Sequence, residues 1–186
     1  TGLGTSSILG ATLLGALSDV CGLGWTQADL VSHTLVLEQL LTTGGGWQDQ
    51  AGGLSPGVKL LTTDGDLDQT PAVRWLPGRL FAERSQSILL YYTGITRVAK
   101  NILGQVVRQI LLNSGEHLRV LAGIAQAADD AADAIQLGDY DRLAAVVDRS
   151  CQLNSRLDPG SYPAPVQAIL APLRDWLLGA KLLGAG

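Results

Sequence analysis

The 186-residue chain contains no methionine, two cysteines, one phenylalanine and only 5% aromatic residues. Cys21 and Cys151 lie far apart and have no partners at metal-ligand spacing, which argues against a disulfide scaffold and against a zinc site. Charged residues make up 16% of the chain, the formal net charge is −4, and Lys and Arg form no run. A nucleic-acid-binding surface is therefore not predicted.

Long hydrophobic runs are also missing. The most apolar segments, ILGATLLGAL and VQAILAPLRDWLLGAKLL, are short or interrupted by Gly, Pro and charge, so we expect no membrane span. The first residues do not show the basic, apolar and small-residue regions of a secretory signal in that order. These features, with the scarcity of cysteine, predict a cytoplasmic enzyme. Because the chain starts at Thr1 and lacks methionine, we expect it to be a segment of a longer protein.

Apolar residues make up 46% of the chain, enough for the core of one large or two small domains. Residues 6–20 are predicted to form a helix, with Thr5 or Ser6 as its N-cap. We expect its buried stripe to consist of Ile8, Leu9, Leu13, Leu14 and Leu17. A second helix is predicted over residues 27–41, and the glycines of TTGGGW should end it.

Strands are predicted in the middle of the chain and helices after it. The segments VKLLTT (58–63), AVRWL (72–76) and SILLYYTG (87–94) have the composition of strands, and QDQAGGLSPG is expected to be a loop. Helical spacing of apolar residues covers 96–112, 115–136, 139–155 and 163–178. The chain is therefore predicted to be an α+β protein with a boundary near Ser85.

The segment GLGTSS directly precedes the first predicted helix. A glycine-rich turn at a helix N-terminus presents backbone N–H groups and the positive end of the helix dipole to an anion. The hydroxyls of Thr5, Ser6 and Ser7 would add contacts to phosphate oxygens or to a Mg²⁺ ion. The alternative, at about even odds on the residues alone, is a small-residue start of a buried helix.

Two carboxylates stand out in the next segment, LVLEQLLTTGGGWQDQAGG. Glu38 lies among leucines and valines, where it must be exposed, paired or bound to a metal ion. Asp49 follows a run of glycines, where it would act either as a turn or cap residue or in chemistry. Mg²⁺ takes one or two carboxylates plus phosphate oxygens, and a further carboxylate helps a hydroxyl attack phosphorus. A phosphate loop with these two carboxylates would make a kinase site.

These motifs resemble a known family. GLGTSS is similar to the phosphate loop of the GHMP small-molecule kinases, in which Gly-Leu-Gly-Ser-Ser precedes a helix. LEQLLTTGGGWQDQAGG resembles the next motif as L-fucokinases have it, including the kinase half of bifunctional fucokinase/fucose-1-phosphate guanylyltransferases. LLYYTGITRVAKNIL and the final KLLGAG are similar to further fucokinase segments. The resemblance covers essentially the whole chain.

The resemblance implies an ATP- and Mg²⁺-dependent kinase that phosphorylates the anomeric hydroxyl of L-fucose or a related sugar. It implies that Ser7 and Glu38 hold Mg²⁺ and that Asp49 is the catalytic base, eleven positions after Glu38. The phosphates of ATP would contact Gly2, Leu3, Gly4, Thr5, Ser6, Ser7, Gly184 and Gly186.

The family fold has an N-terminal domain like domain 2 of ribosomal protein S5 and a ferredoxin-like C-terminal domain. Residues 1–84 and 85–186 would be parts of these two domains, incomplete at both ends. The N-terminal strands and a Gly-Gly-Trp-x-Asp-Thr-Pro sugar-binding segment of the family are not found in the chain.

Two other functions stay open at this point. One is a heptose kinase of the same superfamily, which resembles the TTGGGWQDQ region less. The other is a truncated kinase remnant that acts as a binding or assembly module, whose exposed apolar surface would favour a homo-oligomer.

Overall fold

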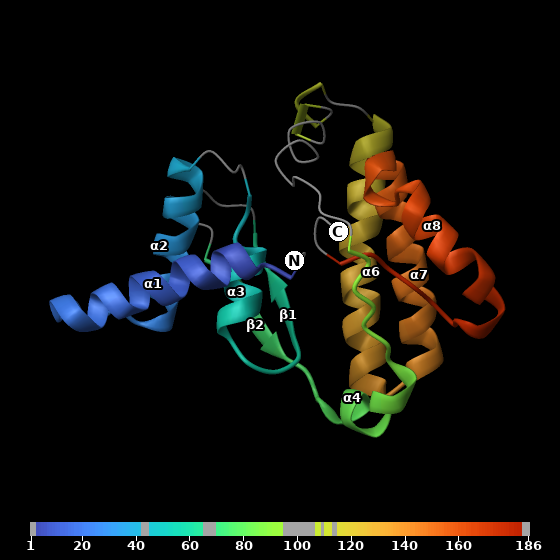
Figure 1. Cartoon of the computed structure of the whole chain (residues 1–186), viewed down its shortest axis with the longest axis horizontal. Coiled ribbons are helices and arrows are strands. Elements are labelled where there is room, and N and C mark those ends of the chain that lie inside the picture. Colours follow the sequence, from blue (N-terminus) through green and yellow to red (C-terminus); the bar gives the residue numbers. More distant parts are fainter. Residues whose placement is uncertain are drawn as a thin grey trace. The chain divides into compact units, whose positions relative to one another are not determined.

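The computed structural model describes residues 3–41, 45–64, 70–94, 107–108, 110–112 and 115–183. The chain divides into two compact units, residues 1–75 and 76–186 (Figure 1). The first unit holds the helices α1, α2 and α3 and the strands β1 and β2, and the second holds the helices from α4 onward. The assignment of 1–84 and 85–186 to two family domains stays a prediction.

The first two helices lie close to where the sequence predicts them. Helix α1 spans Thr5–Cys21 and ends at Gly22, which has a left-handed φ of 65° that a glycine adopts without steric cost. Helix α2 spans Gln27–Leu40 and begins with a capping box. In this box the Asp29 backbone N–H donates to Thr26, and the Thr26 backbone N–H donates back to the Asp29 carboxylate at 2.7 Å. The Thr26 hydroxyl also donates to this carboxylate at 2.7 Å, and this bond first, with that of the Thr26 backbone N–H, holds the pKa of Asp29 below its ordinary value.

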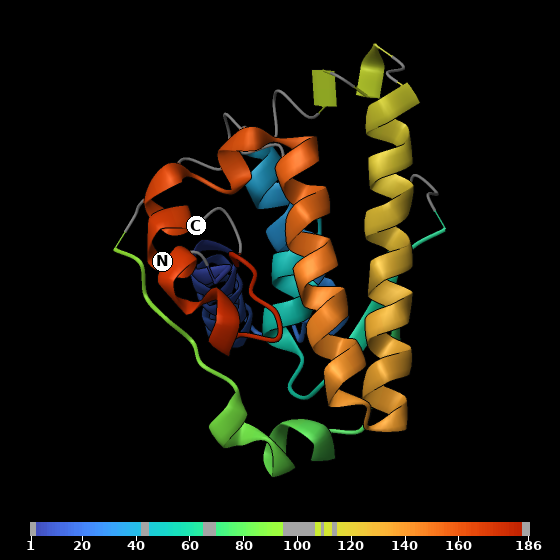
Figure 2. The ribbon, with the colours of Figure 1, turned by 90° about the vertical axis from the view of Figure 1, so that its right-hand side faces the viewer.

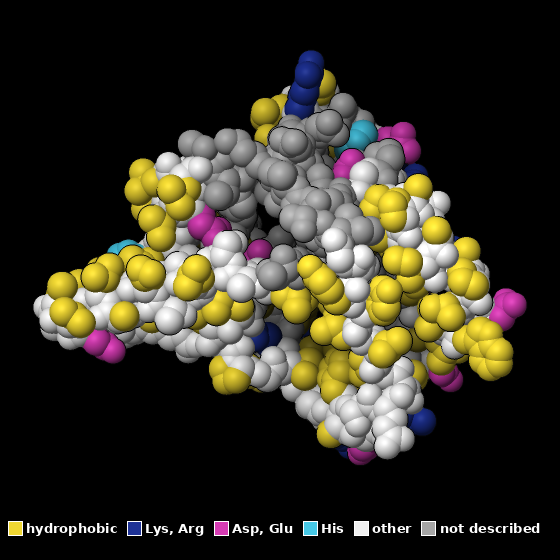
Figure 3. All heavy atoms as spheres, in the orientation of Figure 1, with side chains coloured by type: hydrophobic (Ala, Val, Ile, Leu, Met, Phe, Trp, Pro, Cys, Tyr) yellow, Lys and Arg dark blue, Asp and Glu magenta, His cyan; other side chains and the backbone are white. Residues whose placement is uncertain are grey.

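The buried face of α1 differs in part from the predicted one, since only Ile8 and Leu14 of the expected stripe are half-buried. Its buried residues are Ser7, Ala11 and Ser18, whereas three leucines of the expected stripe are more than half exposed. Figure 3 shows hydrophobic side chains along α1 on the face in view, and the exposed leucines are Leu9, Leu13 and Leu17.

Small residues decide which face α1 buries, because they let another helix approach its backbone. A Cβ atom built on Gly10 would lie 3.6 Å from the Thr34 side chain of α2. One built on Gly15 would lie 3.6 Å from the Leu30 side chain of the same helix. The prediction was wrong for Leu9, Leu13 and Leu17, because α1 packs on α2 through these small side chains and backbone.

Two of the three predicted strands are confirmed. Strand β1 (Lys59–Thr62) pairs antiparallel with β2 (Ala72–Trp75), and Lys59 lies opposite Trp75. The predicted strand over 87–94 is wrong, because residues 88–94 form no ladder with any other described residue. A strand needs a neighbour to satisfy its backbone N–H and C=O groups, so composition alone does not make one.

A short helix replaces a predicted loop. Helix α3 spans Gln48–Leu54 within QDQAGGLSPG, the segment that the sequence marks as a loop because of its glycines. One of these glycines, Gly53, lies against α1, where a Cβ atom would come within 2.7 Å of the Ile8 side chain. The glycine that weakens the helix locally is therefore the one that lets α3 pack against α1.

The second unit is built on a helix pair. Helix α6 spans Gly115–Leu137 and α7 spans Tyr140–Leu157, and the two lie side by side in antiparallel directions (Figure 2). The short turn between them uses Gly138 at a φ of 72°, and the Asp139 side chain accepts a hydrogen bond from the Arg142 backbone N–H. Both helices were predicted, and small or branched side chains fill their shared core, among them Val120, Ala127, Ala134 and Val146.

Shorter elements complete the second unit. They are α4 (Arg79–Glu83), which was not predicted, two short 3₁₀ turns, α8 (Ala164–Leu170) and the 3₁₀ segment Ala171–Trp176. The predicted helix over 163–178 therefore exists, but its second half tightens into a 3₁₀ helix at Pro172. Most of the predicted helix over 96–112 lies outside the described residues. In the described ranges no helix combines the length and apolar character needed to cross a bilayer.

An ion pair joins α6 to α7. Arg149 donates a hydrogen bond to Asp130, Gln126 donates to the same carboxylate at 3.2 Å, and Arg142 lies 4.0 Å from it. These partners, the Arg149 hydrogen bond first, hold the pKa of Asp130 below its ordinary value of 3.8. The stabilisation is therefore present above pH 3.8 and is lost as the pH falls through the lowered pKa.

We expect Asp130→Asn to be slightly less stable than the wild type at pH 7, with no difference in strong acid. Urea unfolding of both proteins at pH 7 and below pH 3.8 measures this. The control is Asp129→Asn, which removes the same charge from the neighbouring exposed position. If both variants lost the same free energy of unfolding at pH 7, the ion pair of Asp130 with Arg149 would contribute nothing to stability.

Candidate active site

The predicted phosphate loop leads into α1 at Gly4. Gly4 is the N-cap residue, with φ 64° and ψ 18°, and its carbonyl accepts the first helical hydrogen bond from Ile8 N at 3.1 Å. The predicted N-caps, Thr5 and Ser6, are wrong by one or two positions, because both lie inside the first turn and are exposed. A glycine N-cap has no side chain to cover the N–H groups of this turn. The helix N-terminus therefore has the form of an anion site.

The remaining loop residues differ in their exposure. Leu3 is about half exposed, and Ser7 is almost fully buried. Gly2 lies outside the described residues, as do Gly184 and Gly186 of the predicted third motif. The proposed contacts of these three glycines with phosphate stay predictions.

Glu38 of α2 is paired with residues from two other segments. Ser7 Oγ of α1 donates a hydrogen bond to Glu38 Oε1 at 2.5 Å, and Gln50 Nε2 of α3 donates to Glu38 Oε2 at 2.7 Å. Glu38 itself is half-buried. The sequence left three alternatives for Glu38, which were exposure, pairing or binding to a metal ion. The structure shows it paired and not fully exposed on the polar face of its helix.

Asp49 lies beside the start of α1. It is an exposed residue in the first turn of α3, where a carboxylate is favoured by the helix dipole. A Cβ atom built on Gly4 would lie 3.1 Å from both Cβ and Cγ of Asp49 and 3.3 Å from Oδ1. The second predicted carboxylate is therefore on a helix, not on a loop, and it touches the predicted phosphate loop.

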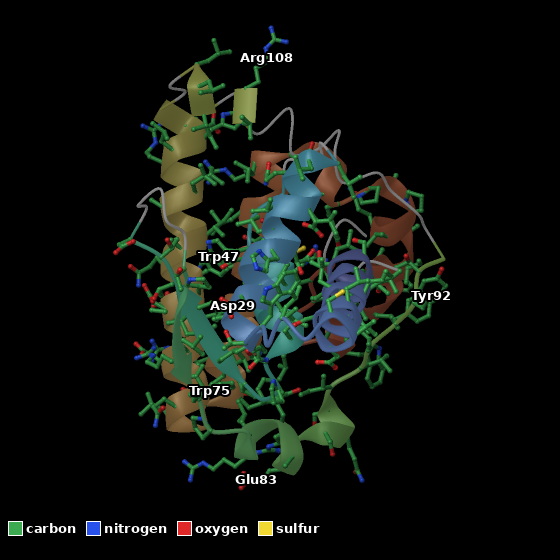
Figure 4. The ribbon with its side chains drawn as sticks, turned by 90° about the vertical axis from the view of Figure 1, so that its left-hand side faces the viewer. Asp29, Trp47, Trp75, Glu83, Tyr92 and Arg108 are labelled. Carbon is green, nitrogen blue, oxygen red and sulfur yellow. The ribbon has the colours of Figure 1, made fainter. Side chains whose placement is uncertain are left out.

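Trp47 begins α3 and so stands two positions before Asp49. It is the N-cap residue of the helix (Figure 4). Its carbonyl accepts a hydrogen bond from Ala51 N at 2.9 Å. The structure shows it as a half-buried residue at the entrance to the helix that carries Asp49.

The donor atoms near Glu38 suit a hard cation such as Mg²⁺. A carboxylate and a hydroxyl come together there, and Mg²⁺ prefers oxygen ligands, usually one or two carboxylates completed by phosphate and water. Within the described ranges no group of three His, Cys, Asp or Glu side chains comes together to hold a metal ion. The pair of Ser7 and Glu38 therefore fits an ion that arrives with nucleotide phosphates better than a permanent protein-bound metal.

Gln50 is the site residue that sequence reasoning missed. Its side chain is fully buried, and it contributes the second hydrogen bond to Glu38. The sequence places it directly after Asp49, but nothing in that position distinguishes a buried Gln from an exposed one. Only the direction of α3 relative to α2 turns it toward the carboxylate.

Comparison with known proteins gives a family match for the N-terminal part of the chain. The family model described as the GHMP kinases N terminal domain matches residues 1–57. The resemblance to the GHMP kinases is thereby confirmed. The GHMP kinase match includes all five residues that meet at the site, namely Gly4, Ser7, Glu38, Asp49 and Gln50.

Two relatives match the whole chain. An L-fucokinase/L-fucose-1-P guanylyltransferase of Bacteroides fragilis is 50% identical over 188 residues, and this match covers all of the chain and 20% of that protein. A bifunctional fucokinase/GDP-fucose pyrophosphorylase of Arabidopsis thaliana is 31% identical over 188 residues, which cover all of the chain and 18% of that protein. The chain therefore spans about a fifth of the length of these two relatives.

Proposed function

We propose that the chain is part of a sugar kinase that transfers the γ-phosphoryl group of ATP to the anomeric hydroxyl of L-fucose. The observation that carries this proposal is the meeting of three segments that are distant in sequence. The start of α1, Glu38 of α2 and Asp49 of α3 lie together, with Ser7 bonded to Glu38 and Gly4 against Asp49. The fucokinase names of the two relatives support the choice of sugar.

In the proposed reaction the residues of the chain bind phosphate and move one proton. The N-terminus of α1 binds the phosphates of ATP through its backbone N–H groups and dipole. Asp49 accepts the proton of the sugar hydroxyl while the sugar oxygen forms a bond to the γ-phosphorus. The bond from this phosphorus to the β,γ-bridging oxygen breaks, and ADP leaves with the electron pair.

Mg²⁺ would be held by Glu38 and Ser7 together with the phosphates. When bound, it supplies positive charge that neutralises the phosphate oxygens as the phosphoryl group moves. The hydroxyl of Ser7 is almost fully buried and already directed to Glu38, so both ligands are held in place before nucleotide arrives. The same pair also brings the end of α2 to the first turn of α1.

The finer features of the predicted fold belong to the same proposal. Residues 1–84 and 85–186 would be parts of the two GHMP domains, with a cytoplasmic location as the composition predicts. The exposed leucines of α1 would be covered in a longer protein or in an oligomer. These features describe the surroundings of the site and do not affect the proposed chemistry.

The direct test is phosphorylation of L-fucose by the purified chain with ATP and Mg²⁺. We expect a sugar 1-phosphate, seen by ³¹P NMR with coupling to the anomeric proton, and no product after chelation of Mg²⁺ with EDTA. A panel containing a heptose and other hexoses tests the heptose kinase alternative. A folded chain that binds ATP and phosphorylates none of these sugars would favour the non-catalytic remnant.

A further inference from the structure

We propose that Gln50 is a positioning residue that holds the Glu38 carboxylate in place for the divalent metal ion. This inference rests on the proposed function, because it takes Glu38 as a metal ligand. It adds a residue that touches neither the sugar nor the phosphates. Gln50 acts through Glu38 alone.

The hydrogen bonds around Glu38 are the first support. Glu38 has a long side chain with several rotatable bonds, and each of its two oxygens receives one donor from a different helix. Ser7 of α1 donates to Oε1, and Gln50 of α3 donates to Oε2. Such hydrogen bonds to a ligating carboxylate fix its orientation.

The buried amide of Gln50 is the second, independent support. Its Oε1 atom is buried and has no hydrogen-bond partner among the described residues. A polar atom buried without a partner is unfavourable, so stability alone would favour an apolar side chain of the same length. The presence of an amide at this buried position is explained if its N–H group is needed to hold the Glu38 carboxylate.

The position of Gln50 next to Asp49 in α3 is the third support. Asp49 and Gln50 are consecutive residues in the first turn of α3, so one short helix brings the proposed base to Gly4 and the amide to Glu38. Packing of Gly53 against Ile8 ties the same helix to α1. The distance between the metal ligand and the base is thereby set by the placement of α3.

The test measures how much Mg²⁺ strengthens nucleotide binding, without turnover. Calorimetry gives the affinity of the full chain for the ATP analogue AMP-PNP with Mg²⁺ and with EDTA, and the ratio isolates the contribution of the metal. In Gln50→Met, which keeps the length of the side chain, we expect this ratio to fall roughly 10- to 100-fold. The affinity measured in EDTA should stay unchanged, whereas a purely structural defect would lower both.

The matched control is Gln48→Met, the same substitution two positions earlier in α3 at an exposed side chain. We expect it to keep the full Mg²⁺ effect. Glu38→Gln should lose most of the effect. If Gln50→Met keeps the wild-type ratio, this inference is overturned and the proposed function stands. If the wild type gains nothing from Mg²⁺, the proposed function fails and this inference fails with it.

A second measurement does not depend on the folding of Gln50→Met. In ¹⁵N-labelled, metal-free protein the side-chain amide protons of Gln50 should exchange slowly with solvent, because they are buried and bonded to Glu38. In Glu38→Ala their resonances should shift more than those of any other Gln side chain. Unchanged Gln50 resonances in this variant would overturn the inference.

Discussion

Asp49→Asn is expected to lower kcat for phosphorylation of L-fucose by roughly 10²- to 10⁴-fold, the usual contribution of a general base. Asn has nearly the same shape as Asp but does not accept the proton of the sugar hydroxyl. The contact of residue 49 with Gly4 should survive, since the atoms there are Cβ and Cγ of the side chain. The affinity for ATP should therefore change little. Steady-state kinetics and calorimetry with AMP-PNP measure the two quantities separately.

The control for this variant is Asp19→Asn, which removes an exposed carboxylate at the other end of α1. It should keep wild-type kcat. If Asp49→Asn retained more than about a tenth of the wild-type rate, Asp49 would not be the base. Loss of ATP affinity together with kcat would instead indicate that the side chain supports the phosphate loop.

Gly4→Ala is expected to lower kcat/KM, by less than the roughly 10²-fold that a 1 Å displacement of catalytic groups produces, because Asp49 must give way by only a few tenths of an ångström. The new Cβ atom would lie 3.1 Å from Asp49, closer than an ordinary van der Waals contact, so either α3 or the loop must move. The left-handed backbone of Gly4 adds a cost of about 1–2 kcal/mol for any residue with a Cβ atom. Kinetics with L-fucose and urea unfolding measure the two effects.

The opposite end of α1 offers a matched control for this backbone cost. Gly22 has φ 65°, close to the 64° of Gly4, and a Cβ atom there would meet nothing within 4 Å. Gly22→Ala should therefore lose a similar free energy of unfolding and keep full activity. If both variants lost activity equally, the effect would arise from the stability of α1 and not from the contact with Asp49.

The helices that the sequence predicted well are those with strong local signals at their ends. The capping box of Thr26 and Asp29 begins α2, the glycine at position 22 ends α1, and Asp139 begins α7. Each signal acts through hydrogen bonds or backbone angles within a few residues, so it can be read without knowing the fold. The strands β1 and β2 were likewise predicted from their composition.

The predictions that failed depend on neighbours that the sequence does not identify. The leucine stripe of α1 was predicted to be buried from its spacing, but the partner helix approaches the side with Gly10 and Gly15. Helix α3 forms in a glycine-rich segment because it packs against α1. The segment 88–94 has the composition of a strand, but it forms no ladder with any described strand.

For the site, the residue types and their order were visible in the sequence, since GLGTSS, Glu38 and the segment WQDQ carry the chemistry of oxygen ligands and a helix N-terminus. The pairing of these groups was decided by tertiary structure. Ser7 and Gln50 meet at one carboxylate, and Asp49 meets Gly4, only because α1, α2 and α3 pack together. Hydrogen bonds and van der Waals contacts act over a few ångströms, so groups up to 45 positions apart in sequence interact only where packing places them.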